Sequence, residues 1–340
     1  MAGFFFPGGP VRYTKPPLSF EQQADLLISR GLQVTHRDKL IEKLQVVNYY
    51  RLSAYWFPFR QADEILKPGT TLELVWGRYV FDRQLRLLVM DAIERVEVAL
   101  KTRMAEQHAR EHGGFGYLSR NCFVQPTHRW NRVKATMKRI VRPILPFCIA
   151  AKRKYLDPHD DFLNRIRQTS AESREEFVRH YFGKYTDEKD LPVWMAVEIM
   201  TLGNMLAMFQ RLAPEEKRAI AGSFHLMAPV LESWILTLNY VRNLCAHHSR
   251  LWNRTLAIRP VIPNKKHGPE WHTPASFGNE KIFAVLTTLR FLLKQVAPQS
   301  QWAERLADLF NRYNRVPLRE MGFPDNWKEC PIWKEHQYGG

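Results

Sequence analysis

Apolar residues recur at helical spacing along most of this chain. Between residues 82 and 108 they follow the i, i+3, i+4, i+7 rule, which predicts one long amphipathic helix with Arg86 off its apolar stripe. Further helices are expected after Pro192, over residues 231–250, and near 280–296 and 301–313. Alternating strand patterns are scarce. The pattern therefore predicts an all-α bundle. The stripe of the long helix consists of Leu85, Leu88, Val89, Ala92, Ile93, Val96, Ala99 and Leu100.

The two ends of the chain look like additions to this bundle. Ser19 precedes Gln22 by three residues, which is the spacing of a capping box at the start of a short helix. Residues 321–333 are rich in proline and tryptophan, which predicts an irregular tail docked by its tryptophans. We expect an N-terminal helical and aromatic extension (1–75), a helical core (76–260), and C-terminal helices with the docked tail (261–340).

An aromatic block, NYYRLSAYWFPF, occupies residues 48–59 and carries Arg51. Exposed aromatic rings next to an arginine can stack on the bases of single-stranded RNA. The alternative is that these rings pack the N-terminal helices onto the rest of the protein, since aromatic residues commonly serve packing. The sequence leaves both interpretations open.

The net charge of +16 and the pI near 9.8 indicate a polyanionic partner. Nucleic acid fits this charge better than an anionic membrane surface, and the alternative is a basic protein with no such partner. A basic segment over residues 129–154 is the expected contact with the RNA backbone, unless it is only a solvated face. Its basic residues are Arg129, Arg132, Lys134, Lys138, Arg139, Arg142, Lys152, Arg153 and Lys154.

The remaining composition predicts a folded cytoplasmic protein. Apolar residues make up 45% of the chain, which suffices for a sizeable core. Four widely spaced cysteines without a CxxC pair favour neither a zinc site nor a disulfide framework. The first residues lack the basic start of a signal peptide, and no run reaches the length of a membrane span. We expect no cofactor and no metal.

The strongest candidate for chemistry is the sequence VRNLCAHH at residues 241–248. On a helix, Asn243 and His247 share a face, and Arg242 has the reach to join them. A histidine can take a proton from a ribose 2′-hydroxyl or give one to the leaving oxygen, and an arginine can hold the scissile phosphate. One histidine does not easily serve as both acid and base, which favours a dimer with two copies of the motif. His248 falls on the apolar stripe and is expected to be structural.

Two other residues are weaker candidates. Arg103 and His108 repeat the Arg-x4-His spacing, but about one such match is expected by chance in a chain of this composition. Arg103 falls on the line of the apolar stripe, so a partly buried structural role is the favoured interpretation. Glu198 lies close to an apolar stripe and is a candidate to orient Arg242, with a simple buried salt bridge as the alternative.

Arg-Asn-x-x-Ala-His at the end of a helix resembles the active-site motif of HEPN ribonucleases. The wider pattern is similar to the Abi family of phage abortive-infection proteins (AbiD/AbiF-like) and extends from Lys15 to Trp333. Besides the aromatic block, the segments that carry this resemblance are FDRQLR (81–86), AIERVEVALKTR (92–103), LPVWMAVEIMTLG (191–203) and MGFPDNW (321–327).

The resemblance implies a HEPN-like helical core, a homodimer that brings two Arg-x4-His motifs together, and RNA cleavage in bacterial antiviral defence. Arg242 and His247 match the defining positions of the motif, and Asn243 matches its polar second position. Some relatives work with a structured non-coding RNA that restrains the toxin. The leading hypothesis is thus a metal-independent endoribonuclease toxin. The alternatives are a non-catalytic RNA-binding scaffold and, with less support, a phosphotransfer protein, against which the lack of a glycine-rich phosphate loop argues.

Overall fold

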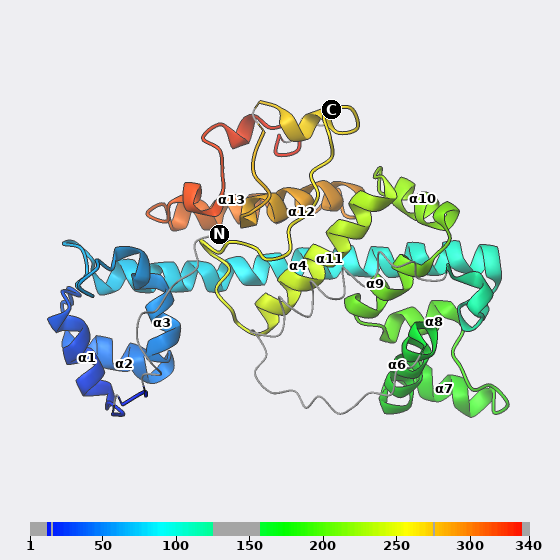
Figure 1. Cartoon of the computed structure of the whole chain (residues 1–340), viewed down its shortest axis with the longest axis horizontal. Coiled ribbons are helices and arrows are strands. Elements are labelled where there is room, and N and C mark those ends of the chain that lie inside the picture. Colours follow the sequence, from blue (N-terminus) through cyan, green and yellow to red (C-terminus); the bar gives the residue numbers. More distant parts are fainter. Residues whose placement is uncertain (1–11, 15, 125–156, 275, 335–340) are drawn as a thin grey trace. The chain divides into compact units, whose positions relative to one another are not determined.

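The computed structural model describes residues 12–14, 16–124, 157–274 and 276–334, and helices dominate the three longer ranges (Figure 1). Within them no strand pairs into a sheet, and β-type pairing is limited to two isolated bridges, Gln33–Thr71 and Arg60–Leu66. The predicted all-α fold is confirmed. The chain divides into two compact units, residues 1–81 and 82–340, which we describe separately.

The described residues of the first unit form three short helices and the beginning of a fourth. These are α1 (Phe20–Ser29), α2 (Arg37–Val46) and α3 (Tyr49–Trp56), followed by a 3₁₀ turn, η1 (Phe57–Phe59). The predicted capping box is present: the Ser19 side chain accepts from the Gln22 amide, and the Gln22 side chain accepts from the Ser19 amide. Both contacts satisfy amides that would otherwise lack a partner at a helix start.

The long helix α4 (Leu72–His112) starts earlier than its periodicity predicts and runs from the first unit into the second. Gly113, at φ +73°, ends it in the left-handed conformation that glycine adopts without strain. Most of the predicted stripe is buried, including Leu85, Val89 and Ala92. Arg86 is buried as well, so its predicted position off the stripe is wrong. Its partner, described below, explains how a charge is accommodated there.

After α4, the described residues of the second unit form short turns and six further helices before residue 247. These are η2 (Gly116–Leu118), η3 (Arg120–Cys122), α6 (Pro158–Glu172), α7 (Glu176–Lys184), α8 (Val193–Ile199), α9 (Leu202–Arg211), α10 (Pro214–Ser223) and α11 (Ala228–Ala246). The single helix expected after Pro192 is wrong, because Thr201 caps a new helix by accepting from the Asn204 amide at 3.2 Å. Helix α11 packs against α9, α10 and α12.

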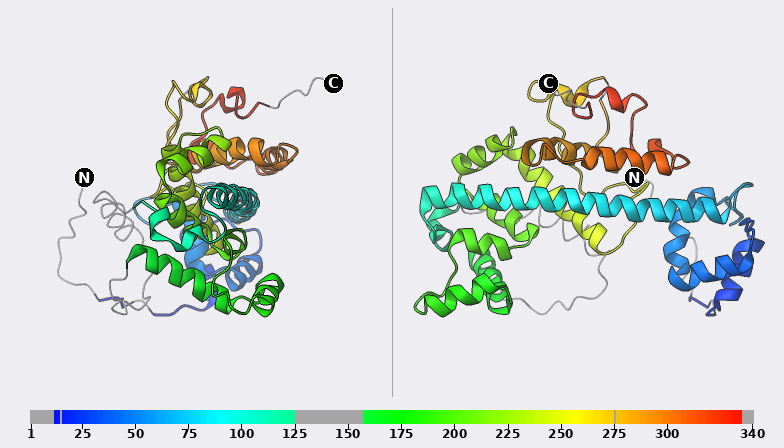
Figure 2. Two further views of the ribbon diagram at one scale, coloured as in Figure 1. Left: turned by 90° about the vertical axis from the view of Figure 1, so that its right-hand side faces the viewer. Right: turned by 180° about the vertical axis from the view of Figure 1, so that it is seen from behind.

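In the C-terminal part of the second unit, two helices lie along α4, and the short turns lie beyond them (Figures 1 and 2). This part comprises η4 (Pro269–His272), α12 (Ile282–Val296), α13 (Trp302–Arg312), η5 (Leu318–Met321) and η6 (Trp327–Glu329). Trp302 of α13 donates from Nε1 to the Leu88 carbonyl of α4 at 2.8 Å. The tail is docked by a tryptophan as predicted, since Trp333 is buried and donates to Thr287 Oγ1 at 3.0 Å.

None of the described helices is by itself long and apolar enough to cross a membrane. Helices α10 and α11 pass that test of length and composition only as a pair, which is bent by 73°.

Candidate active site at the end of helix α11

Helix α11 ends in a Schellman motif within the candidate sequence. His247 is the C-cap, and its amide still donates to the Asn243 carbonyl at 3.0 Å. The next two amides fold back, His248 to Cys245 at 3.0 Å and Ser249 to Leu244 at 2.8 Å, which is the hydrogen-bond pattern of this motif. Because the helical bond of His247 persists, Asn243 and His247 share a face as the sequence predicts.

The three candidate side chains lie at the protein surface. Asn243 and His247 are exposed, and Arg242 is half-buried. Exposed Ala246 is their neighbour at the end of the helix, and its small side chain leaves the imidazole and the amide accessible. None of the three polar side chains forms a hydrogen bond or an ion pair with another described residue. They are therefore available to a ligand or to a second protein chain.

Asp82 and Arg86 of α4 anchor the backbone that follows the motif. Asp82 is fully buried, and its Oδ1 accepts from the amides of Leu251, at 3.0 Å, and Trp252, at 2.5 Å. It also forms a buried ion pair with Arg86, whose guanidinium donates to the Ser249 carbonyl at 3.5 Å. Charge-assisted hydrogen bonds of this kind are stronger than neutral ones. The segment that follows α11 is thus held against α4 by Asp82 and by Arg86.

Cys245 and His248, which neighbour the three candidate residues, are not candidates for catalysis. Burial raises the pKa of the Cys245 thiol to about 12; the positive charge of Arg86 opposes this shift, whereas Asp82 adds to it. A thiol of such high pKa is a poor nucleophile at neutral pH. His248 is exposed and adopts φ +54°, so its predicted place on the buried stripe is wrong. Helix α11 has already ended before His248, so the helical spacing that placed His248 on the apolar stripe does not extend to this residue.

The second Arg-x4-His match has structural partners. Arg103 is half-buried, donates to the Ser223 carbonyl at 2.5 Å and stacks on Phe224 at 4.0 Å. His108 is fully buried and lies 2.9 Å from Glu216. Both side chains are occupied within the fold, which agrees with the interpretation favoured from the sequence.

Glu198 is exposed, and both interpretations of its carboxylate from the sequence are wrong. Its backbone carbonyl accepts from Lys101 Nζ at 3.2 Å, and no ion pair joins it to Arg242 among the described residues. Trp194, one turn before Glu198 on α8, is 54% exposed, so this face of the helix is turned to solvent and not to the core.

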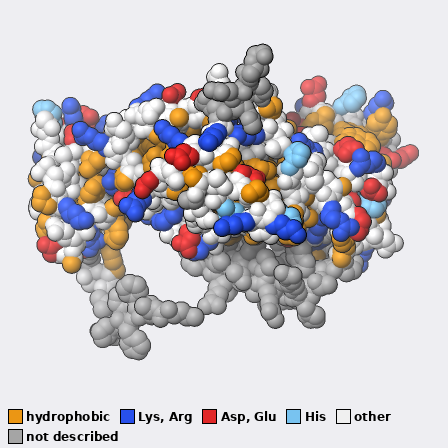
Figure 3. Space-filling view, turned by 90° about the horizontal axis from the view of Figure 1, so that it is seen from above, with side chains coloured by type: hydrophobic (Ala, Val, Ile, Leu, Met, Phe, Trp, Pro, Cys, Tyr) orange, Lys and Arg blue, Asp and Glu red, His pale blue; other side chains and the backbone are white. Residues whose placement is uncertain are grey.

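The basic segment 129–154 lies outside the described residues, and its role in RNA binding stays a prediction. On the face shown in Figure 3, basic side chains are interspersed with acidic and apolar ones. In the first unit, Arg51 is exposed, and the aromatic block divides by helix face: Tyr55 and Trp56 are buried, whereas Tyr50 and Phe57 are exposed. The block therefore packs the unit with one face and offers rings to solvent with the other.

The exposed side of the aromatic block borders a hollow of about 540 Å³, lined among others by Tyr49, Tyr50 and Phe57. Arg30 and Arg60 lie at its edge, but both are paired with Glu64. Part of their positive charge is thus already neutralised. The hollow is better suited to flat rings than to a phosphate group.

Sequence reasoning missed two groups that the fold assembles. The first is the Asp82–Arg86 anchor. The second consists of His108 and His112 of α4 and Glu216 of α10, whose possible metal-ligating atoms all lie within 4.8 Å of one another. Burial tends to raise the pKa of Glu216, but hydrogen bonds and positive charge from both histidines outweigh it and lower this pKa. The His-x3-His spacing was the only local signal for this group, since Glu216 is remote in sequence.

Comparison with known proteins relates this architecture to one family. The model of a family described as Abi-like protein matches residues 42–253, which include the aromatic block, α4 and the whole candidate site. No significant match was found among curated proteins or among solved structures.

Proposed function

The chain belongs to the Abi-like protein family, and from this premise we propose that it is a metal-independent endoribonuclease of the HEPN type. In this proposal it acts as the toxin of a bacterial abortive-infection system, in which an infected cell stops phage multiplication by cleaving RNA. Its catalytic residues are Arg242, Asn243 and His247.

One observation carries the proposal: an arginine, an amide and an imidazole stand accessible at an anchored helix end. Arg103 and His108 have the same spacing, yet each already has a partner within the protein: the Ser223 carbonyl for Arg103 and Glu216 for His108. Arg242 and His247 have no such partner among the described residues, although the backbone that follows them is held by Asp82. Catalytic groups need this combination of free functional atoms and a fixed support.

The reaction follows from the chemistry of these side chains. His247 takes the proton of the ribose 2′-hydroxyl, and the 2′-oxygen attacks the adjacent phosphorus. A 2′,3′-cyclic phosphate forms, the bond to the 5′-oxygen breaks, and that oxygen receives a proton. Arg242 offsets the negative charge that builds on the phosphate oxygens, and Asn243 donates a hydrogen bond to the phosphate or ribose.

The proton for the leaving oxygen requires a second acid, which a homodimer supplies. Two α11 ends facing each other across a two-fold axis would place the partner's His247 on the opposite side of the phosphate. The exposed face formed by Asn243, Ala246 and His247 is the surface that such a partner would cover. Each protomer then contributes one arginine and one histidine to a shared centre.

RNA is also the partner that fits the bulk charge. A net charge of +16 favours association with a polyanion and predicts an affinity that falls steeply with salt. A structured non-coding RNA that is bound before infection would cover the basic surface and restrain the toxin. RNA that copurifies with the protein and survives nuclease treatment would identify such a partner.

The direct test is cleavage of single-stranded RNA in EDTA. We expect products that end in 2′,3′-cyclic phosphate or 3′-phosphate, because the 2′-hydroxyl is the nucleophile. End groups are read by mass spectrometry and by resistance to ligation. Cleavage that depends strictly on Mg²⁺ or Mn²⁺ and leaves 3′-hydroxyl ends would rule out this mechanism.

The shared centre is tested by mixing chains. With a constant amount of wild-type chain and an increasing excess of His247→Ala chain, heterodimers form that carry only one histidine at the centre. Activity per wild-type chain is then expected to fall in proportion to the loss of wild-type homodimers. Activity that stays constant per wild-type chain, or full activity from a 40.1 kDa monomer, would exclude a shared centre.

A further inference from the structure

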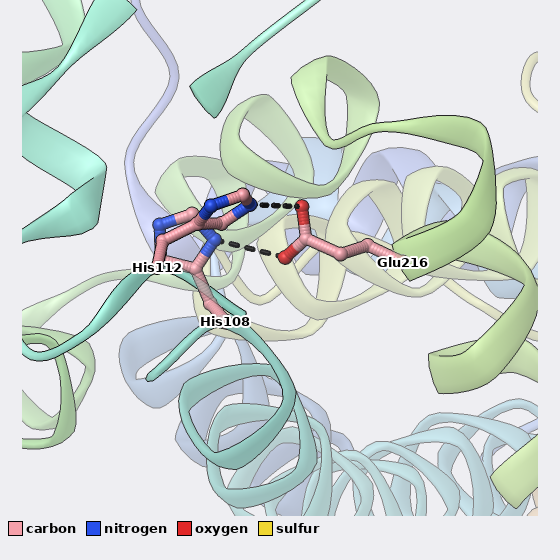
Figure 4. A group of neighbouring side chains, drawn as sticks. All are labelled: His108, His112 and Glu216. Atoms are coloured by element: carbon pink, nitrogen blue, oxygen red, sulfur yellow. Dashed lines mark hydrogen bonds and ion pairs between the residues drawn. The ribbon is translucent and has the colours of Figure 1, made fainter. Parts of the chain in front are cut away.

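Two histidines of α4 and a glutamate of α10 converge on one another (Figure 4). His108 and His112 lie one helical turn apart, and Glu216 is the third residue of α10. Nδ1 of His108 lies 2.9 Å from Oε1 of Glu216, and Nε2 of His112 lies 3.2 Å from Oε2. Both imidazole rings are thus directed at the same carboxylate.

The carboxylate at the centre of this group is buried. Glu216 is 3% exposed and His108 is 0% exposed, whereas the His112 side chain keeps 27% of its surface in solvent. Among the described residues no lysine or arginine forms an ion pair with Glu216. A buried carboxylate needs a positive partner to offset its lost hydration. The N-terminus of α10 favours a carboxylate only partly; among the described residues, the two histidines, or a cation that they hold, are the groups placed to supply a full positive charge.

The surrounding chain encloses the rings closely. A Cβ atom on Gly116 would clash with His112 Cβ and would lie 3.4 Å from His108 Nε2, so the loop after α4 passes directly over the pair. Phe123 stacks on the His108 ring with centroids 5.6 Å apart. Nε2 of His108 is buried and has no hydrogen-bond partner among the described residues. The imidazoles are thus fixed by packing, and the open side is at His112.

We propose that His108, His112 and Glu216 bind a divalent transition-metal ion of the zinc class. Imidazole nitrogen and carboxylate oxygen are the donors that zinc takes in proteins, at about 2.0–2.2 Å from the ion. With the three donor atoms within 4.8 Å of one another, small side-chain movements bring them to these distances. The ion replaces the protons shared between the rings and the carboxylate, and a water on the His112 side completes its coordination.

The ion acts as a clamp between the end of α4 and the start of α10. Along α4, His108 lies about 33 Å from Arg86, the residue that supports the candidate active site, so the ion has no part in RNA cleavage. Binding to the folded state alone stabilises the protein by mass action. The metal site therefore does not depend on the proposed ribonuclease activity.

The test compares zinc binding by full-length, tag-free protein with that of three variants. Metal-free protein is prepared by dialysis against EDTA and then against metal-free buffer, and is titrated with Zn²⁺ by calorimetry and by thermal unfolding. We expect one high-affinity equivalent of zinc and an unfolding temperature that rises with Zn²⁺ concentration. His112→Ala and Glu216→Gln are expected to weaken binding by at least about 100-fold. His180→Ala, which removes an exposed histidine of α7, is the matched control and should bind as the wild type does.

Glu216→Gln keeps the size of the side chain, so it remains informative if His112→Ala fails to fold. Co²⁺ offers a second readout, because its visible absorption reports nitrogen and oxygen ligands directly. The proposal would be overturned if the wild-type protein bound no more zinc than Glu216→Gln does, or if its unfolding temperature did not change with Zn²⁺ concentration. Circular dichroism of the EDTA-treated protein separates the two proposals: metal-free protein that stays folded and cleaves no RNA contradicts the ribonuclease, not the metal site.

Discussion

Replacing Arg242 or His247 by alanine is expected to lower RNA cleavage by about 10²-fold or more in each case. A positioned proton-transfer group contributes about 10²–10⁴-fold to a rate, and a group that stabilises transition-state charge contributes about 10²–10³-fold. Both side chains lie at the surface or half-buried, so the fold should tolerate their loss. Initial rates of RNA cleavage and RNA affinity are measured on the same preparations.

His248→Gly is the matched control for His247→Ala. His248 is exposed at φ +54°, a conformation that glycine adopts more readily, and this change should leave the cleavage rate within about threefold of wild type. RNA affinity should change little in all three variants, because the proposal assigns most of the binding energy to other basic residues. Variants that bind and cleave as the wild type does would refute the assignment. Wild-type protein that binds RNA without cleaving it would favour a non-catalytic scaffold.

Replacing Asp82 by alanine is expected to destabilise the protein by about 3–5 kcal/mol. The change breaks a buried ion pair by removing the carboxylate that faces Arg86, and it removes the acceptor of the Leu251 and Trp252 amides. The free energy of unfolding is measured by denaturant titration followed by circular dichroism. Because these amides belong to the segment that follows the motif, cleavage by the folded fraction should also fall.

Asp91→Ala on the same helix is the control for this prediction. Asp91 is 29% exposed and pairs with Arg95 and Arg305 near the surface. Such pairs contribute about 0–1 kcal/mol, so its loss should cost far less than that of Asp82. Equal effects of the two substitutions would mean that the buried anchor contributes no more than a surface ion pair.

The spacing of residues in the sequence predicted those features that depend on contacts between residues three or four positions apart. The apolar stripe from Leu85 to Leu100 and the capping box at Ser19 were legible because their partners lie three or four residues away. The same holds for Asn243 and His247, which share a face through one helical hydrogen bond. Their resemblance to a catalytic motif stays a hypothesis until cleavage is measured.

Only the tertiary structure decided which charged residues are buried and what they contact. Arg86 is polar by type, yet it is buried, because Asp82 one turn earlier neutralises it and also binds backbone amides about 170 positions further on. Glu198 is exposed because it lies one turn after Trp194 on the solvent-facing side of α8. The two histidines of α4 contact Glu216 only because the fold brings the start of α10 to them. Periodicity describes one helix at a time. The free energy of a buried charge depends on a partner that the rest of the chain must bring to it.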